Sequence, residues 1–211
     1  MNSPLNVPLP ELSFALPGVL LLAMPMLVAA PTRAEVRTGQ TVVVKQGEVV
    51  EGNLYATGGT VMVHGTVQGD VVAVGGTIVI DGPVIGDVLS AGGQVTISGR
   101  VDGDIRATGG QVSLLAPVGG DVAIGGGNVH VDGNVTGDAM LAAGAAALTG
   151  DVGHSLYAGV GELHVASEVG GDIVAQGGRL VLEDGAQVIG DVTYAGPSAL
   201  PPPSSASARS R

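Results

Sequence analysis

Residues 69–85 read GDVVAVGGTIVIDGPVI, residues 86–102 read GDVLSAGGQVTISGRVD, and residues 103–119 read GDIRATGGQVSLLAPVG. The three stretches align position by position: each begins with Gly-Asp and carries Gly-Gly at its seventh and eighth places. Gly-Asp pairs recur at 69, 86, 103, 120 and 137, His154-Ser155 and Gly171-Asp172 hold the next two positions, and Gly52-Asn53 fits upstream. Gly190-Asp191 follows only after nineteen residues, so two residues are inserted near Glu183–Gln187. A fixed period of this kind indicates stacked structural repeats.

The aliphatic residues of each repeat fall in five columns, at the third, fifth, tenth, twelfth and sixteenth places, with largely polar residues between them. Alternation over short spans predicts strands whose aliphatic side chains point inward. One repeat cannot bury its own apolar side chains, so the repeats must stack. We therefore predict an all-β protein, a triangular parallel β-helix with 17-residue coils, about eight to nine in number. The step from the tenth to the sixteenth place is six residues, but the step from there to the third place of the next coil is four, unlike the constant six of a left-handed hexapeptide helix, which favours right-handed winding.

Composition limits the possible functions. The 211 residues include 37 Gly at regular intervals, but one Phe, three Tyr and no Trp, so an aromatic core is excluded. The formal net charge of −11 disfavours nucleic acid as a partner, because binding it requires a basic surface. The absence of cysteine excludes disulfides, thiolate metal sites, a Cys nucleophile and lipidation at Cys.

The two ends of the chain differ from the repeats. Residues 1–34 contain an apolar run, roughly Leu12 to Ala30, and a small-residue exit that predicts cleavage after Ala34 and export to the periplasm or cell surface. The alternatives are an uncleaved anchor, which would hold the protein at the inner membrane, and a misassigned start codon. Residues 35–51 are expected to form a lead-in or first partial coil, residues 52–196 the β-helix, and residues 197–211 a disordered Pro/Ser-rich tail.

The pattern GxVxGDVxAxGGxVxI, repeated through residues 52–196, resembles the bactofilins, the polymer-forming bacterial cytoskeletal family. The resemblance implies a right-handed triangular β-helix with short disordered tails. It also implies end-to-end assembly into filaments without nucleotide, often at a membrane. Bactofilins are usually cytoplasmic, so the export-like N-terminus points to a secreted or membrane-tethered variant.

The Gly-Asp pairs create a column of carboxylates: Asp70, Asp87, Asp104, Asp121, Asp138, Asp172 and Asp191. Stacked about 5 Å apart, carboxylates repel by roughly 1 kcal/mol per pair in water, so something must offset the repulsion. One interpretation is a ladder of cation sites, with Ca²⁺ as the natural ion for oxygen ligands. The interpretation we favour is that each Asp accepts backbone N–H groups at its corner.

No other group of residues predicts catalysis or a cofactor. His130 and His164 share the eleventh place two coils apart, too far to bind one metal ion, and His64 stands in another column. The residue types of a Ser/His/Asp catalytic triad are present in Ser155, His154 and nearby aspartates. Nothing in the sequence places them in a pocket. We expect a protein that is not an enzyme and binds neither metal nor cofactor.

Two surfaces remain as candidates for interaction. The outward fourth place carries a series of apolar residues. Such a series indicates an interaction surface, for lateral pairing or for a partner, or it reflects only the preference of these residues for strands. Its members are Tyr55, Val72, Leu89, Met140, Tyr157 and Val174. Neither end of the repeats carries a capping helix, which favours end-to-end stacking. The residues expected at the stacking ends are Val42, Val44 and Val49 at one and Val192 and Tyr194 at the other. The sequence thus predicts a self-polymerising scaffold of the bacterial envelope; the alternative is a secreted, adhesin-like monomeric rod.

Overall fold

The computed structural model describes residues 33–196 and 198–199, which contain fifteen β-strands and no helix. Eleven strands form one parallel sheet. In spatial order ten of them are β1 (Ala34–Val44), β3 (Asn53–Val63), β5 (Val71–Ile80), β6 (Val88–Ile97), β7 (Ile105–Leu114), β8 (Val122–Val131), β9 (Ala139–Leu148), β10 (Leu156–Val165), β12 (Ile173–Leu182) and β14 (Val192–Ala195), and β15 (Ser198–Ala199) pairs with β12. Two small sheets pair β2 (Val49–Val50) with β4 (Thr66–Val67) and β11 (Glu168–Val169) with β13 (Gln187–Val188).

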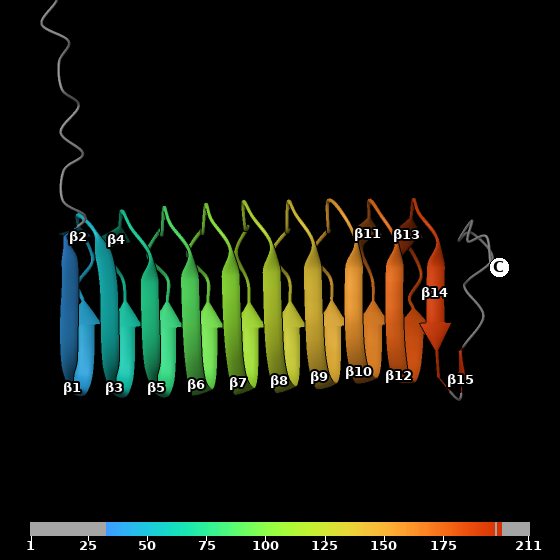
Figure 1. Cartoon of the computed structure of the whole chain (residues 1–211), viewed down its shortest axis with the longest axis horizontal. Coiled ribbons are helices and arrows are strands. Elements are labelled where there is room, and N and C mark those ends of the chain that lie inside the picture. The colour runs from blue at the N-terminus through green and yellow to red at the C-terminus, as the bar shows by residue number, and fades with distance from the viewer. Residues whose placement is uncertain (1–32, 197, 200–211) are drawn as a thin grey trace, which may run out of the picture. The chain divides into compact units, whose positions relative to one another are not determined.

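The strands stack side by side along a solenoid, one long strand to each coil (Figure 1). We number the coils in order: coil 1 is residues 33–51, coil 2 is 52–68, and coils 3 to 8 begin at 69, 86, 103, 120, 137 and 154. Coil 9 is 171–189 and coil 10 begins at Gly190. The predicted parallel β-helix is confirmed, and right-handed winding stays a prediction.

Each coil has three faces. The long strand bends at the glycine pair of places seven and eight, so its first half forms face 1 and its second half face 2 (Figure 1). Face 3 is held by parallel bridges between successive sixteenth-place valines, from Val67 to Val169. The five inward columns are at most 5% exposed from coil 2 to coil 8, so they form one continuous core.

Glycine is favoured at most bends by close approach of the backbone, although Ala143 and Val160 hold the seventh place in coils 7 and 8. A Cβ on Gly75 would lie 2.6 Å from the carbonyl oxygen of Gly58 in the preceding coil. In the described part of the chain, only Gly47, Gly177 and Gly185 have positive φ, so most corners do not use the left-handed region. Glycine at the bend therefore allows coils to stack at the spacing of parallel strands.

Coil 7 has small residues in the core, with Ala139 and Ala146 in the third and tenth places. Leu141, which is 1% exposed, occupies the fifth place, where most coils carry alanine. In coil 8, Val160 replaces the usual bend glycine and is buried. Together these larger side chains refill the interior next to the alanines.

The structure extends the expected coil count to ten among the described residues. The lead-in is a full coil, because β1 pairs with β3 from Ala34 to Val44. Its register is offset by nineteen residues at Val44↔Val63 and by seventeen at Val49↔Thr66, so two extra residues lie in the corner 45–48. Coil 9 carries the same insertion in the same corner, at 183–186. Both corners close with a backbone hydrogen bond of 3.0 Å and contain a glycine with positive φ.

Candidate functional site

The aspartate column forms a ladder of side-chain to backbone hydrogen bonds. Asp70 Oδ1 accepts the N–H of Asp87 at 3.0 Å, and Asp87 Oδ1 accepts that of Asp104 at 2.9 Å. The same bond recurs from Asp104, Asp121, Asp138 and Asp172 to the next coil, with Asn53 and Ser155 acting as acceptors at the two places where aspartate is missing. The donor therefore belongs to the equivalent residue of the following coil, not to the same corner.

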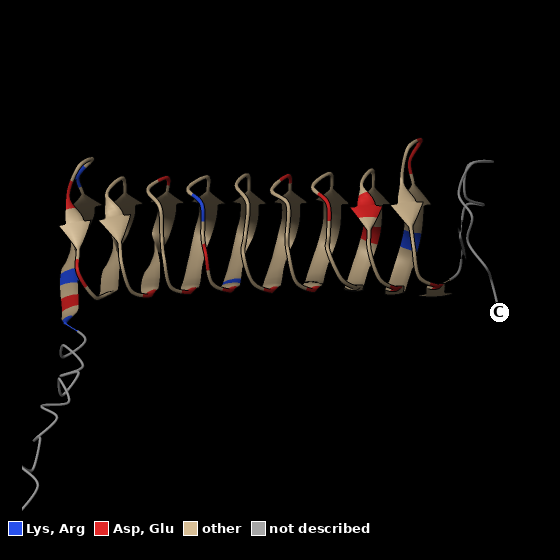
Figure 2. Ribbon diagram, turned by 90° about the horizontal axis from the view of Figure 1, so that it is seen from above, with Lys and Arg blue, Asp and Glu red and all other residues tan. Residues whose placement is uncertain are grey.

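This ladder runs along one edge of the solenoid, where acidic residues recur from coil to coil (Figure 2). One oxygen of each carboxylate from Asp70 to Asp172 is committed to the backbone, which is the arrangement expected of a coil-to-coil connector. Within residues 33–196 and 198–199, no group of three or more His, Asp or Glu side chains is arranged to hold a metal ion.

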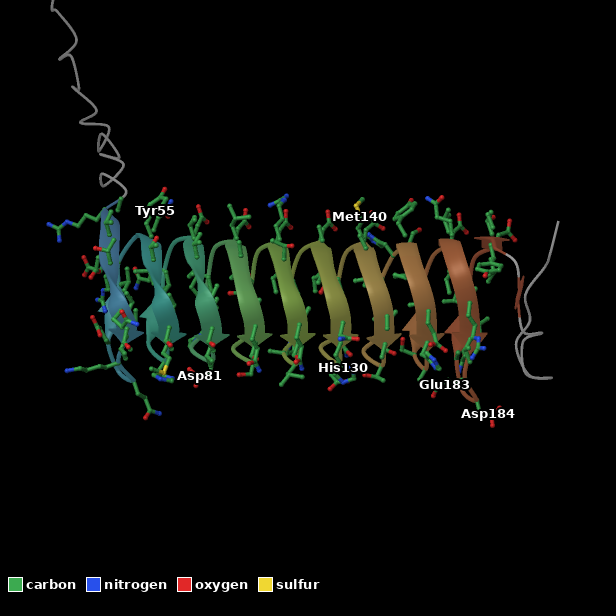
Figure 3. The ribbon with its side chains drawn as sticks, turned by 90° about the horizontal axis from the view of Figure 1, so that it is seen from below. Tyr55, Asp81, His130, Met140, Glu183 and Asp184 are labelled. Atoms are coloured by element: carbon green, nitrogen blue, oxygen red, sulfur yellow. The ribbon has the colours of Figure 1, made fainter. Side chains whose placement is uncertain are left out.

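The fourth-place stripe lies on face 1 and is exposed to solvent. Leu89 and Met140 are 52% and 58% exposed, and Tyr55, Tyr157 and Val174 are 41–42% exposed, while Val72 is half-buried. Figure 3 shows Tyr55 and Met140 projecting from the same side of the solenoid, opposite His130 and Glu183. The stripe is interrupted in coils 5 and 6, where Arg106 and Ala123 take the fourth place.

A notch lies at this interruption. Because Ala123 is short, a hollow of about 370 Å³ opens over it, lined by Arg106, Asp121, Asp138, Met140 and Tyr157 among others. Arg106 pairs with Asp104 at 3.1 Å and with Asp87 at 4.0 Å in its own chain, with its side chain 58% exposed. The hollow thus has Ala123 at its floor and the carboxylates of Asp121 and Asp138 in its lining.

Coil 1 carries a partly exposed ion cluster. Its register places Glu35 and Arg37 opposite the buried Leu54 and Ala56, so both charged residues stand in inward columns. The Arg37 guanidinium donates from Nε to Glu35 Oε1 at 2.7 Å and from Nη1 to the carbonyl oxygen of Val43 at 2.8 Å.

Glu48 completes this cluster from the inserted corner. Arg37 Nη2 donates to Glu48 Oε1, and Glu48 Oε2 accepts the N–H of Lys45 at 2.8 Å. The hydrogen bond with Arg37 and the Lys45 N–H hold the pKa of Glu48 below its usual value, and the bond to Glu48 raises that of Arg37.

The N-terminal coil therefore differs from the bare core expected from the sequence. Val42 and Val44 are 4% and 0% exposed inside coil 1. Val49 is 51% exposed, and the expectation that it extends the core is wrong. Val49 pairs with Thr66 in the outward fifteenth place, and the inward sixteenth place belongs to Val50, which pairs with Val67. Reading the sequence upstream with a nineteen-residue offset before the corner would have placed Arg37 opposite Ala56, and the ordinary seventeen-residue offset after it places Val50 opposite Val67.

The C-terminal end is apolar. Leu182 and Val188, which continue the twelfth- and sixteenth-place columns, are only half-buried, whereas the same places are at most 2% exposed in coils 2 to 8. Val192 and Tyr194 hold the third and fifth places of coil 10 and pack against the core. The Tyr194 hydroxyl donates to the carbonyl oxygen of Gly177 at 3.3 Å, which fixes the ring at the end of the stack.

The histidines pair with acids on the surface. His164 Nδ1 lies 3.0 Å from Glu183 Oε1, and its Nε2 lies 3.3 Å from Glu162 Oε1. The bond to Glu183, followed by that to Glu162, raises the pKa of His164. Glu183 belongs to the coil 9 corner, so the imidazole connects that corner to face 2. His64 pairs with Asp81 at 2.7 Å in the same way.

Comparisons with protein-family models, curated proteins and solved structures each found no match. The structure defines the class of the chain as a β-solenoid. The resemblance to bactofilins rests on the repeat pattern of the sequence. Residues 33–196 and 198–199 include no helix long and apolar enough to cross a membrane. The predicted leader or anchor, apart from Arg33 and Ala34, and most of the predicted tail lie outside the described residues.

Proposed function

We propose that the chain is a non-enzymatic structural scaffold, a bactofilin-like rod of the bacterial envelope that stacks end to end with copies of itself without nucleotide. The observation that carries the proposal is the C-terminal end, where the core columns continue to the last coil but are only half-covered. Half-buried Leu182, Val188 and Val192 give that end an apolar surface, and burying such a surface favours association.

The other end supplies a matching surface. β1 and β14 are the terminal strands of the described sheet, and a parallel stack offers complementary backbone groups at its two ends. Repeating the coil-to-coil translation would bring Arg37 of a following copy onto Tyr194, because both occupy the fifth place. A guanidinium over a tyrosine ring is a favourable contact. The rods would therefore join head to tail.

The N-terminal segment supports a place in the envelope. An apolar run followed by small residues fits export or an inner-membrane anchor. Mass spectrometry of the protein recovered from a bacterial membrane and periplasm would show which form is present, since cleavage after Ala34 leaves Glu35 as the first residue.

The test of stacking is negative-stain microscopy and sedimentation velocity of the full chain beside a Tyr194→Lys variant. Lysine at this place would face Arg37 of the next copy, so we expect filaments in the wild type and short particles in the variant. Ile85→Lys is the matched control, because Ile85 is 50% exposed on face 3 away from both ends. Discrete rods in the wild type at all concentrations would contradict the proposal and favour the monomeric surface-binding alternative.

A further inference from the structure

We propose that two copies of this chain pair laterally, face 1 against face 1, with their rods antiparallel and a two-fold axis between coils 5 and 6. The pair is independent of end-to-end stacking, because it uses a face rather than an end and closes at two copies. The argument begins from Arg106, the one basic residue of the fourth place, and the notch over Ala123 beside it.

A two-fold axis along the strand direction reverses the rod and keeps each place opposite the same place. With the axis between coils 5 and 6, Arg106 of one copy lies over Ala123 of the second copy, and the contact occurs twice. The notch offers an apolar floor for the side-chain stem and the carboxylates of Asp121 and Asp138 for the guanidinium. The occupant that fits this notch in charge and shape is therefore a second copy's Arg106.

The same axis matches the rest of the fourth-place stripe. Coil 4 lies opposite coil 7, coil 3 opposite coil 8, and coil 2 opposite coil 9. The facing pairs are then Leu89 with Met140, Val72 with Tyr157, and Tyr55 with Val174. Each pair is apolar on both sides, and each tyrosine meets a valine. Moving the axis to coil 5 would put Arg106 against Arg106, and moving it to coil 6 would put Arg106 against Met140.

The outward sixth place supports this register independently. Val74, which is 48% exposed, comes opposite Gly159, and Thr108 comes opposite Gly125. A Cβ placed on Gly159 would meet no atom within 4 Å, and one on Gly125 would meet none closer than 3.6 Å, so both glycines stand beside open space. A larger side chain meets a glycine in both pairs, as interdigitating sheet faces require.

The area is sufficient for a stable pair. Face 1 is about five residues wide at ~3.3 Å each and about nine coils long at ~4.8 Å each. Two such faces bury roughly 1,400 Å² together, within the range of specific interfaces.

The aspartate ladders of the two copies lie along the same edge of this interface, and their repulsion opposes pairing. Arg106 reduces it at the centre, because its guanidinium has donors enough to keep its own Asp87 and Asp104 while reaching Asp121 of the second copy. Screening by salt weakens the remaining repulsion, so the pair should tighten as ionic strength rises.

Cross-linking tests the register. The chain has no cysteine, so single-cysteine variants report unambiguously. A mixture of full-length Leu89→Cys and Met140→Cys treated with a short bis-maleimide should give a cross-linked dimer. Leu89→Cys alone should give none, because its counterpart would lie three coils away, about 14 Å along the rod. Equal cross-linking of Leu89→Cys alone, or none in the mixture, would overturn the proposal.

Sedimentation equilibrium tests the contact. We expect Ala123→Phe, which fills the notch, and Arg106→Glu each to raise the dissociation constant of the dimer at least tenfold. The controls are Ala147→Phe on face 2 and Arg100→Glu on face 3, which make the same chemical changes and should leave pairing unchanged. Equal losses in variants and controls would contradict the proposal. Measuring all of them in the Tyr194→Lys background removes end growth, so failure of stacking and failure of pairing are told apart.

Discussion

The ladder of aspartates predicts different outcomes for two substitutions at Asp87. Its Oδ1 accepts the Asp104 N–H at 2.9 Å, and its own N–H donates to Asp70 at 3.0 Å. Asp87→Asn keeps an acceptor oxygen and removes a charge, whereas Asp87→Ala removes both. The comparison between the two variants therefore isolates the acceptor from the charge.

The magnitudes follow from the geometry. Carboxylates one coil away on each side repel Asp87 by up to about 1 kcal/mol each before screening. Asp87→Asn relieves that repulsion, weakens one charge-assisted hydrogen bond and removes the exposed ion pair of Asp87 with Arg106 at 4.0 Å, which contributes little, so its unfolding free energy should stay within about 0.5 kcal/mol of the wild type. Asp87→Ala leaves the Asp104 N–H without its acceptor, and we expect it to be about 1 kcal/mol less stable than Asp87→Asn.

Urea unfolding followed by circular dichroism, with Ca²⁺ and with EDTA, measures these differences. The control is the same pair of substitutions at Asp184, an exposed residue of the coil 9 corner outside the ladder. If the asparagine and alanine variants of Asp87 are equally destabilised, and Ca²⁺ stabilises the wild type alone, the ladder binds cations through its charge and the hydrogen-bond reasoning is refuted.

Three further predictions concern buried or paired groups. Arg37→Met removes the common partner of Glu35 and Glu48, and should lower the unfolding free energy by about 1–2 kcal/mol, between the values for exposed and buried ion pairs. Because the folded-state pKa of Glu48 is depressed, this stabilisation is present above the ordinary value of 4.5 and is lost as the pH falls through the folded pKa, which urea titrations at several pH values would show. The pKa of His164 is raised, so the stability that its pairing adds is fully present below pH 6.5 and is lost as the pH rises through the folded pKa; comparing His164→Gln with the wild type across this range, with an NMR titration of the imidazole, checks the direction. Ser90 is buried with no hydrogen-bond partner for its hydroxyl among the described residues. Ser90→Ala should therefore raise the free energy of unfolding by about 1 kcal/mol, which a higher urea midpoint would show.

The repeat made the fold predictable. Columns such as the third and twelfth places record the same backbone position in every coil, so alternation and period together specify strands, corners and core. The inserted corner at 183–186 was also visible, because Gly190-Asp191 breaks the spacing. Such features follow from the chain's own periodicity.

The ends were less predictable because the frame shifts there. Coil 1 has the same two-residue insertion as coil 9, but it is the first coil of the described residues, and the sequence before it shows no Gly-Asp pair that would mark the break in spacing. Arg37 therefore reads as a polar residue of a lead-in, although it lies in an inward column with two carboxylates. For the aspartate ladder, the sequence predicted that each aspartate accepts a backbone N–H. It did not predict that the N–H belongs to the next coil, because only the stacked geometry shows that.

Some residues differ in type from the other residues at the same place of the repeat, and such differences indicate a role beyond coil stacking. Val160 departs from the bend glycines and is accounted for by the small residues of coil 7 that it helps to cover. Arg37 departs from the fifth-place alanines and belongs to the ion cluster of coil 1. Arg106 departs from the apolar stripe, and its exposed ion pairs with Asp87 and Asp104 contribute little to folding. Arg106 also stands beside the Ala123 notch, and the symmetry of the stripe about that point makes a second copy the partner that fits.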